Sequence, residues 1–431
     1  MDIKQIRKEI EKLTGLSAWE IRRHRKKSLQ RYLIFDQMES QRQVETEKFG
    51  VSLYTIRDQE GLKVLGESSL VLSEGDDIPE RILTAFEMAG LIANPVFALP
   101  GKGLIYGEVG ILDPDLRDQP LSYLDRVQED LVAAPLPGVK RSSAEIYIEE
   151  KEFFLVNSNG LERGQTSSEI LVEFVLLAEK GALLEGESQA TRRVRFYKDL
   201  HLTEILETYA RFAREAQEAG LPKSGTYPVV FSGEALDTLF NFFVLQSSGP
   251  ASFQNWSQFH LEQAVIQEIT GEPLTLFSNP AFPWGLRSRS LDENGLPLQR
   301  VEVIRENIFK KRMNNKRYAD YLQEEPTGDF SNIEVKSGAQ SEEALLSGSP
   351  CYHLVRFSTF EPNPITGAFS GEIRTGYLIR DGQRQPVKGG SVSGRMQEAF
   401  RRAFFSKETT RREAYFGPTA VRIEKLEIAG E

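Results

Sequence analysis

The chain has 431 residues, of which 40% are hydrophobic and 27% are charged, with 34 glycines and one cysteine. These proportions are ordinary for a globular protein, and no run reaches the roughly 18 to 20 apolar residues that a membrane span needs, so the fibrous, disordered and membrane-spanning classes are excluded. The formal net charge is -10, although residues 1–31 carry ten Lys or Arg against four Asp or Glu. An acidic body argues against general nucleic-acid binding.

The single cysteine, Cys351, excludes an internal disulfide and a metal site made of several thiolates. The four histidines are far apart in the sequence. The N-terminus is charged and lacks the apolar core of an export signal, so we expect a cytoplasmic protein. The length predicts two or three domains.

Apolar residues at helical spacing (Ile3, Ile6, Ile10) predict a first helix that stops at Gly15. The basic run 22–27 follows, and its expected place is a solvated helix or a strand edge, because no aromatic stacking set accompanies it. Alternating segments from there to residue 72 predict an antiparallel sheet.

Asp77 is the expected N-cap of a helix that ends before Asn94. Alternating runs over 144–156 and 167–178, with a turn at 157–160, predict further strands. The clearest helical stripe runs from Leu202 to Ala216.

A domain boundary is predicted at residues 221–227, which gives an N-terminal domain over 1–222 and a C-terminal domain over 223–431. The N-terminal domain has an alternative division into 1–130 and 131–222. In the C-terminal half we expect a short strand, a helix capped by Ser232, and then mostly strands. The predicted fold class is α+β.

The stretch 275–330 combines four prolines and three glycines with large apolar residues. It therefore predicts an ordered loop, with no helix and no central strand in its first half. Residues 292–295 carry turn chemistry, 299–304 alternate like a strand, and 305–307 predict a hairpin turn.

Several of these segments, taken in chain order, resemble the signature of the TldD/PmbA family, a peptidase family once labelled modulator of DNA gyrase. The matching pieces are residues 156–160, 227–230, 278–280, 285–286, 292–297, 327–328, 331–333 with Gly338 and 341–343, 363–370 and 376–387. The resemblance implies a C-terminal β-rich TldD/PmbA domain and an N-terminal antiparallel sheet with helices.

TldD-like members of that family hold zinc with a His-Glu-three residues-His helix and a later cysteine, and PmbA-like (TldE) members lack these ligands. No histidine here is followed by glutamate. A gapless register from Tyr227 places Asn241, Phe242 and Gln246 at the ligand and base positions. The cysteine position falls between residues 410 and 416, which contain no cysteine.

The resemblance therefore implies a zinc-free, PmbA/TldE-like component of an intracellular peptidase assembly that proteolyses unfolded peptides or peptide precursors. We expect no catalytic residue, metal or other cofactor in this chain, and neither nucleic acid nor membrane as a partner. The expected partner is a zinc-bearing TldD-like chain or a second copy in a dimer. The residues expected to line the cleft or contact peptide are Asn279, Trp284, Asp292, Glu293, Thr327 and Asp329.

Two other functions stay open on the sequence. The first is a stand-alone homodimer that binds peptides or another partner without catalysis. The second is a metal-independent hydrolase that uses Cys351 or a serine. Cys351 and His353 would share one face of a strand, as a nucleophilic pair requires. Ordinary packing on a half-buried strand explains the two residues better than catalysis does. His260 is expected on a helix, in the core or at its rim, and a role as metal ligand is the weaker alternative because no partner is spaced to join it.

Overall fold

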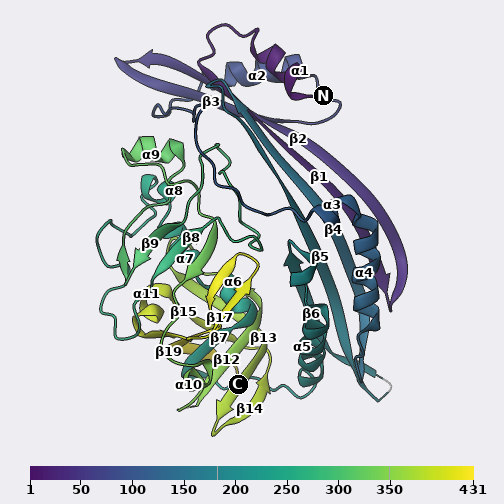
Figure 1. Ribbon diagram of the computed structural model, residues 1–431. Helices are drawn as coiled ribbons and strands as arrows, with labels where there is room; N and C mark the ends of the chain where they lie inside the picture. Colours follow the sequence, from purple (N-terminus) through teal and green to yellow (C-terminus); the bar gives the residue numbers. More distant parts are fainter. Residues whose placement is uncertain (182, 349) are drawn as a thin grey trace.

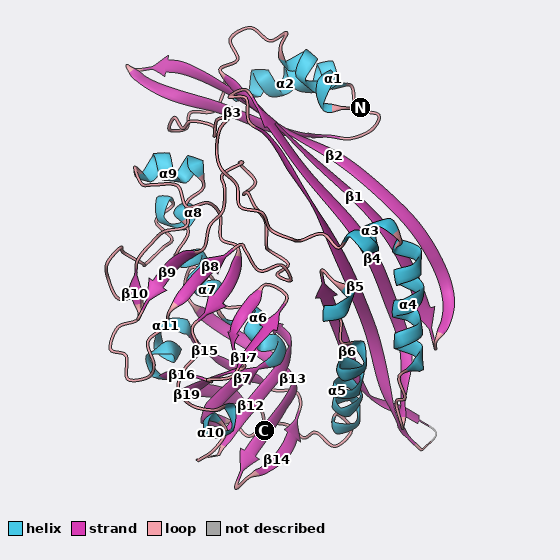
Figure 2. Ribbon diagram, viewed as in Figure 1, coloured by secondary structure: helices cyan, strands magenta, loops and turns pink. Residues whose placement is uncertain are grey.

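The computed structural model describes residues 1–181, 183–348 and 350–431. Within these ranges, no helix is both long and apolar enough to cross a membrane. The chain is α+β, as predicted, with a long antiparallel sheet followed by a β-rich C-terminal half (Figure 1, Figure 2).

The N-terminal sheet has six antiparallel strands in the order β3-β2-β1-β4-β5-β6. Figure 1 shows these strands running side by side and curving along the length of the molecule. The strands are β1 (Ala18–Ile34), β2 (Gln37–Gln59), β3 (Leu62–Leu72), β4 (Val139–Asn157), β5 (Glu162–Lys180) and β6 (Leu183–Val194).

Helices cover one face of this sheet, because alternate residues of each strand carry the apolar side chains. Ile21 packs with Ile6 and Ile10 of the first helix. Leu29, on the same side of β1, packs against a second core that includes residues of three later helices. The N-terminal helices are α1 (Ile3–Ile10), α2 (Ile78–Ala89), α3 (Pro114–Asp118), α4 (Pro120–Ala133) and α5 (Leu202–Glu215), with a 3₁₀ turn η1 (Tyr197–Asp199).

The basic run 22–27 lies inside β1, which is paired on both sides, by β2 and β4. The expectation of a helix or a strand edge was therefore wrong. Carboxylates of the two neighbouring strands face the run, as in the ion pairs Lys26–Glu149 at 2.9 Å, with β4, and Arg25–Glu45 at 2.5 Å, with β2. Cross-strand pairing of opposite charges explains how a basic segment occupies the middle of a sheet.

The C-terminal half contains two sheets. One has the order β12-β7-β19-β15-β13-β14, with β16 paired to β19, and the other has the order β10-β9-β8-β11-β18-β17. Their strands are β7 (Gly225–Ser232), β8 (Leu276–Asn279), β9 (Val301–Arg305), β10 (Ile308–Phe309), β11 (Asn332–Val335), β12 (Cys351–Phe360), β13 (Ala368–Arg380), β14 (Gln383–Val387), β15 (Ser391–Arg395), β16 (Ala403–Phe405), β17 (Thr409–Arg412), β18 (Tyr415–Pro418) and β19 (Ala420–Ala429).

Short helices fill the space around these sheets, and one buried core joins both sheets, for example through Phe231, Ile304 and Tyr415. The C-terminal helices are η2 (Gly233–Ala235), α6 (Leu236–Leu239), α7 (Asn241–Gln246), α8 (Gly249–Phe253), α9 (Lys316–Leu322), α10 (Glu342–Leu345), α11 (Met396–Ala399) and η3 (Phe400–Arg402).

Helix α5 connects the two halves. Its Leu206 and Ala210 pack with Phe174 of the N-terminal sheet, while its Phe212 packs with Val230 of the C-terminal sheet. Figure 2 shows this helix between the long sheet and the C-terminal strands. Burial of apolar surface on both sides of one helix holds the halves together.

Some expectations for the C-terminal half were wrong. The first residues of the stretch 275–330 form β8, which lies between β9 and β11, so a central strand does run there. It fits because Leu276–Asn279 ends before the first proline. His260 is exposed in a loop and lies on no helix.

Candidate functional site

Helix α7 carries the three residues at the register of the family's metal helix. Phe242 is completely buried and packs edge to face with Phe243 and Phe259, at ring distances of 5.4 and 6.0 Å. Gln246 is also completely buried. This segment is therefore part of the hydrophobic core.

The amide of Gln246 is saturated by backbone groups. Its Nε2 donates to the carbonyls of Pro364 at 2.8 Å and Trp256 at 3.1 Å, and its Oε1 accepts from the Gln258 N–H at 2.6 Å. A buried amide that is satisfied in this way stabilises the surrounding loops. Because Phe242 offers no ligand atom and Gln246 has none to spare, this donor set does not fit zinc.

The hairpin β17–β18 contains the segment where the resemblance places a ligand cysteine. Arg412 at the end of β17 donates Nε and Nη2 to the two carboxylate oxygens of Asp237 on α6, both at 3.0 Å. Burial disfavours the charged guanidinium, but the pairing with Asp237 outweighs burial and raises the pKa of Arg412. An ion pair thus joins the hairpin to the helix. No group of three His, Cys, Asp or Glu residues is placed to hold a metal in the described parts of the chain.

The loop after β8 is anchored by a buried arginine of the N-terminal domain. Arg195 is 4% exposed, and it donates to the backbone carbonyls of Gly285 at 2.8 Å, Leu286 at 2.7 Å and Ser288 at 3.4 Å. Burial lowers the pKa of Arg195 to about 10. A guanidinium suits this role because its donors form a planar fork that reaches several carbonyls at once.

The predicted turn at 292–295 is present and closes on Asp292. Oδ1 of this residue accepts hydrogen bonds from the N–H groups of Asn294 and Leu296, each at 2.9 Å. Gly295 has φ +92, and a Cβ there would lie 2.3 Å from Leu161 of the N-terminal domain. The turn therefore needs glycine both for its backbone conformation and for its close contact with the other domain.

Asp292 has no exposed surface, and its second oxygen, Oδ2, is buried without a hydrogen-bond partner in the described chain. Burial, and after it the carboxylate of Asp329, raises the pKa of Asp292 to about 7. Burial also raises the pKa of Asp329, although Arg289 opposes this effect. Near neutral pH the turn can therefore carry a proton on Asp292.

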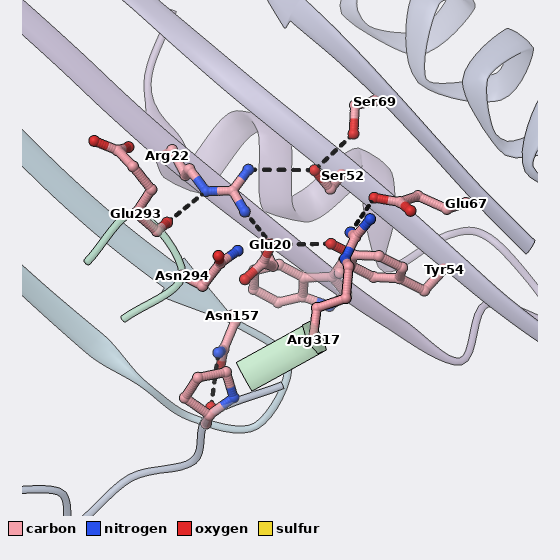
Figure 3. Close-up of polar contacts among 12 residues, drawn as sticks. Glu20, Arg22, Ser52, Tyr54, Glu67, Ser69, Asn157, Glu293, Asn294 and Arg317 are labelled. Carbon is pink, nitrogen blue, oxygen red and sulfur yellow. Dashed lines mark hydrogen bonds and ion pairs between the residues drawn. The ribbon is translucent and has the colours of Figure 1, made fainter. Parts of the chain in front are cut away.

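A polar network on β1 and β2 meets this turn from the opposite domain (Figure 3). Arg22 donates Nε to the carbonyl of Glu293 at 2.8 Å, and its Nη2 is bonded to the completely buried Glu20. Tyr54 donates its hydroxyl to the same Glu20 oxygen at 3.0 Å. Burial raises the pKa of Glu20, while Arg22 opposes the rise.

Helix α9 extends the same contact. Figure 3 shows Arg317 reaching from α9 to Glu67 on β3, and the two form an ion pair. Sequence reasoning missed this network. Its residues lie in separate strands and on a helix that was not predicted, so no local motif marks them.

The six residues expected at the cleft fall into separate places. Asp292, Glu293 and Asp329 lie around Arg289, which is 3.4 Å from a Glu293 oxygen and 3.9 Å from an Asp329 oxygen. Thr327 lies on an open pocket of about 670 Å³.

The other two lie earlier in the chain, at the end of β8 and in the loop that follows it. Asn279 is buried and donates Nδ2 to Glu334 at 2.7 Å, so it acts as a structural residue of β8. Trp284 stacks on Phe282 at 5.0 Å and lines a second pocket, of about 270 Å³. Trp284 therefore both anchors the loop and lines a pocket.

Cys351 and His353 lie in β12, and both are buried. His353 Nε2 is 2.6 Å from Oγ of Ser232, whereas its Nδ1 finds no partner among the described residues. Burial lowers the pKa of His353 to about 4 and raises the pKa of Cys351. Ser232 was expected to cap a helix, but within the described structure its side chain makes no capping bond. The reason is that its hydroxyl is hydrogen-bonded to the ring of His353.

The sequence of this chain is similar to those of several known proteins. Residues 224–430 match the family model described as the PmbA/TldA metallopeptidase C-terminal domain. An uncharacterised protein of Methanocaldococcus jannaschii is 22% identical over 348 residues, which cover 76% of this chain and 78% of that protein. A Saccharolobus solfataricus protein named zinc metalloprotease TldD homolog is 24% identical over 277 residues, or 60% of this chain and 61% of that protein.

Solved structures share the whole fold. TldE from Thermococcus kodakarensis superposes with a TM-score of 0.81 at 19% identity, covering 99% of each chain. A Thermotoga maritima protein described as a candidate modulator of a DNA gyrase gives a TM-score of 0.80 at 18% identity, covering 99% of this chain and 100% of that one. With the family model matching its C-terminal domain, the chain belongs to the TldD/PmbA family.

Proposed function

We propose that this chain is the zinc-free, PmbA/TldE-like component of a TldD/PmbA peptidase assembly that acts on unfolded peptides or peptide precursors. In this proposal a zinc-bearing sister chain carries out the hydrolysis. The present chain supplies a wall of the peptide cleft, made of the loop that follows β8.

The observation that carries the proposal is the state of helix α7. Phe242 and Gln246 are completely buried, and the polar atoms of Gln246 are used by the backbone of neighbouring loops. A metal helix must instead present free ligand atoms towards a cavity. The residues at this register therefore serve packing.

The anchored loop gives further support. Arg195 binds three of its carbonyls and Arg22 binds a fourth, so the N-terminal domain holds the loop in one conformation. Such pre-organisation is what a binding wall needs, because a peptide then meets a surface that does not have to become ordered.

The first experiment is metal analysis and a peptidase assay on the purified chain. We expect less than stoichiometric zinc and no hydrolysis of an unfolded peptide substrate. Stoichiometric zinc together with hydrolysis by the isolated chain would contradict the proposal.

The second experiment adds a family member that has the His-Glu-three residues-His motif. We expect the two chains to copurify, and hydrolysis to require both of them. As a control, a sister chain with the motif glutamate replaced by glutamine should assemble but remain inactive. Full activity of the sister chain alone, or a homodimer of the present chain that excludes it, would argue for the stand-alone binding function instead.

A further inference from the structure

A pocket of about 270 Å³ lies between the free edges of two sheets. β6 is the last strand of the N-terminal sheet, and β17 is the last strand of the C-terminal sheet with the order β10-β9-β8-β11-β18-β17. Within the described chain no further strand pairs with the outer edge of either. Three consecutive residues of each strand, 192–194 and 409–411, line the pocket. Because neighbouring residues of a strand point to opposite faces, a pocket lined by three in a row runs along the strand edge.

β6 contributes two arginines to this pocket, Arg192 and Arg193. Arg192 donates Nη2 to the carbonyl of Asp199 at 3.1 Å, but its buried Nε has no partner among the residues that the structure describes. Neither Arg192 nor Arg193 forms an ion pair in those residues. A buried guanidinium donor without a partner is costly, so an anion that reached Nε of Arg192 would be stabilised.

The charges around the pocket leave one positive charge in excess. Arg411 lies 3.7 Å from Asp199, and Arg412 pairs with Asp237 at 3.0 Å. Glu413 is the remaining carboxylate, set against Arg192 and Arg193. Among the residues that line the pocket, three guanidinium groups face two carboxylates, those of Asp199 and Glu413, in a protein whose overall charge is -10. One bound monoanion would therefore neutralise the charge of the pocket.

An apolar surface adjoins these charges. Trp284 lines the pocket, with the guanidinium of Arg411 at 6.0 Å from its ring centre. A ligand that combines one carboxylate with an apolar side chain and an extended backbone would match the arginines, the tryptophan and the free strand edges together.

We propose that this arginine pocket, formed by Arg192, Arg193 and Arg411 beside Trp284, binds the C-terminal carboxylate of a peptide. The inference rests on the proposed function in taking a peptide as the ligand. It adds the end of the peptide that is recognised and the residues that recognise it. Two charge-assisted hydrogen bonds from arginine to a carboxylate give affinity and orientation.

The test is calorimetric titration of the isolated full-length chain with acetyl-Ala-Ala-Ala-Leu, as the free acid and as the C-terminal amide. We expect the acid to bind at least about tenfold more tightly than the amide. Arg193→Gln, at an exposed position, should weaken binding of the acid about tenfold and leave the amide unchanged. Arg192→Gln should do the same, with chemical denaturation to verify folding. Arg374→Gln, on β13 and outside the lining of the pocket, is the matched control and should bind as the unmodified chain does.

Equal affinity for acid and amide, absence of binding, or full binding by both arginine variants would overturn the proposal. Displacement of the peptide by inorganic phosphate at similar concentration would also overturn it, because the pocket would then be a general anion site. The readout is independent of hydrolysis. If the isolated chain binds the acid selectively but forms no active assembly with a zinc-bearing chain, the carboxylate pocket is supported and the proposed function is contradicted. If the assembly is active but the chain shows no preference for the acid, the proposed function is supported and the pocket is contradicted.

Discussion

Arg195 shows how a single side chain can hold a whole loop. Replacing it with methionine keeps the length but removes every donor, which leaves the carbonyls of Gly285, Leu286 and Ser288 without this partner. We expect Arg195→Met to lower the free energy of unfolding by about 2 to 4 kcal/mol, measured by urea denaturation. Arg374→Met, whose side chain is 48% exposed, should change it by less than about 0.5 kcal/mol. A similarly small effect of Arg195→Met would mean that the loop after β8 keeps its conformation without Arg195.

Asp292 makes stability depend on pH in an unusual direction for a carboxylate. With its pKa raised to about 7, the folded state binds a proton that the unfolded state, with a pKa of about 4, has already released. Stability from this group is therefore full below about pH 4 and is lost as the pH rises to about 7. The whole effect is about 4 kcal/mol, and Asp329 adds to it in the same direction.

We therefore expect Asp292→Asn to flatten the fall in stability between pH 5 and pH 7.5, measured by urea denaturation at several pH values. Asparagine keeps the oxygen that accepts from Asn294 and Leu296, so the turn should persist. Asp58→Asn, at an exposed position, is the control and should leave the profile unchanged. An Asp292→Asn profile as steep as that of the unmodified chain would assign the pH dependence elsewhere.

At the scale of elements, the turn at 292–295 depends on close packing between domains. In Gly295→Ala, the new Cβ would meet Leu161 at 2.3 Å and Leu155 at 2.8 Å, on a backbone with φ +92. We expect a loss of about 2 to 5 kcal/mol, from left-handed strain and from overpacking.

Gly103→Ala separates these two causes. Gly103 has φ +88, and a Cβ added there would have nothing within 4 Å, so only the backbone strain of about 1 to 2 kcal/mol applies. Equal losses at Gly103 and Gly295, measured by chemical denaturation, would show that contact with Leu161 and Leu155 is unimportant.

Helix α7 gives a prediction about restoring the family's motif. Phe242→Glu places a carboxylate at a completely buried position that packs on Phe243 and Phe259, so we expect a loss of about 3 to 5 kcal/mol or failure to fold. Phe242→Leu keeps the position apolar and should cost about 1 to 2 kcal/mol. Nearly equal stability of the two variants, measured by thermal and urea denaturation, would show that this side chain faces solvent.

At the scale of the whole molecule, the two halves should unfold as one unit. Arg22 and Arg195 of the N-terminal domain both bind the loop after β8, and α5 packs on both halves. We expect a single calorimetric transition for the unmodified chain and two transitions for the double variant Arg22→Met with Arg195→Met, because weakly joined domains unfold separately. The double variant Lys140→Met with Arg374→Met, at exposed positions, is the control. A single transition in the Arg22 and Arg195 variant would assign the coupling to α5.

Much of the fold could be predicted because its signals are local. Alternating residues marked β4 and β5, Asp77 marked the start of α2, and the turn residues at 292–295 marked their own turn. The loss of the zinc ligands was also readable, since it needs only residue identities in order. Helix α4 was missed although Leu124, Val127 and Leu131 lie at helical spacing.

The remaining features depended on contacts between distant residues. Arg22 and Glu293 are 271 positions apart, and Ser232 and His353 are 121 apart. Their meeting depends on how β1 and the loop after β8, or β7 and β12, are brought together.

By itself, the sequence determined the α+β class, most strands and the absence of a zinc motif, because period, turn chemistry and residue type act within a few positions. Only the tertiary structure decided that Gln246 is saturated, that Asp292 is buried beside Asp329, and that the edges of two sheets bring three arginines together in one pocket. Burial and charge balance are properties of the packed chain, since each depends on every element that surrounds a group.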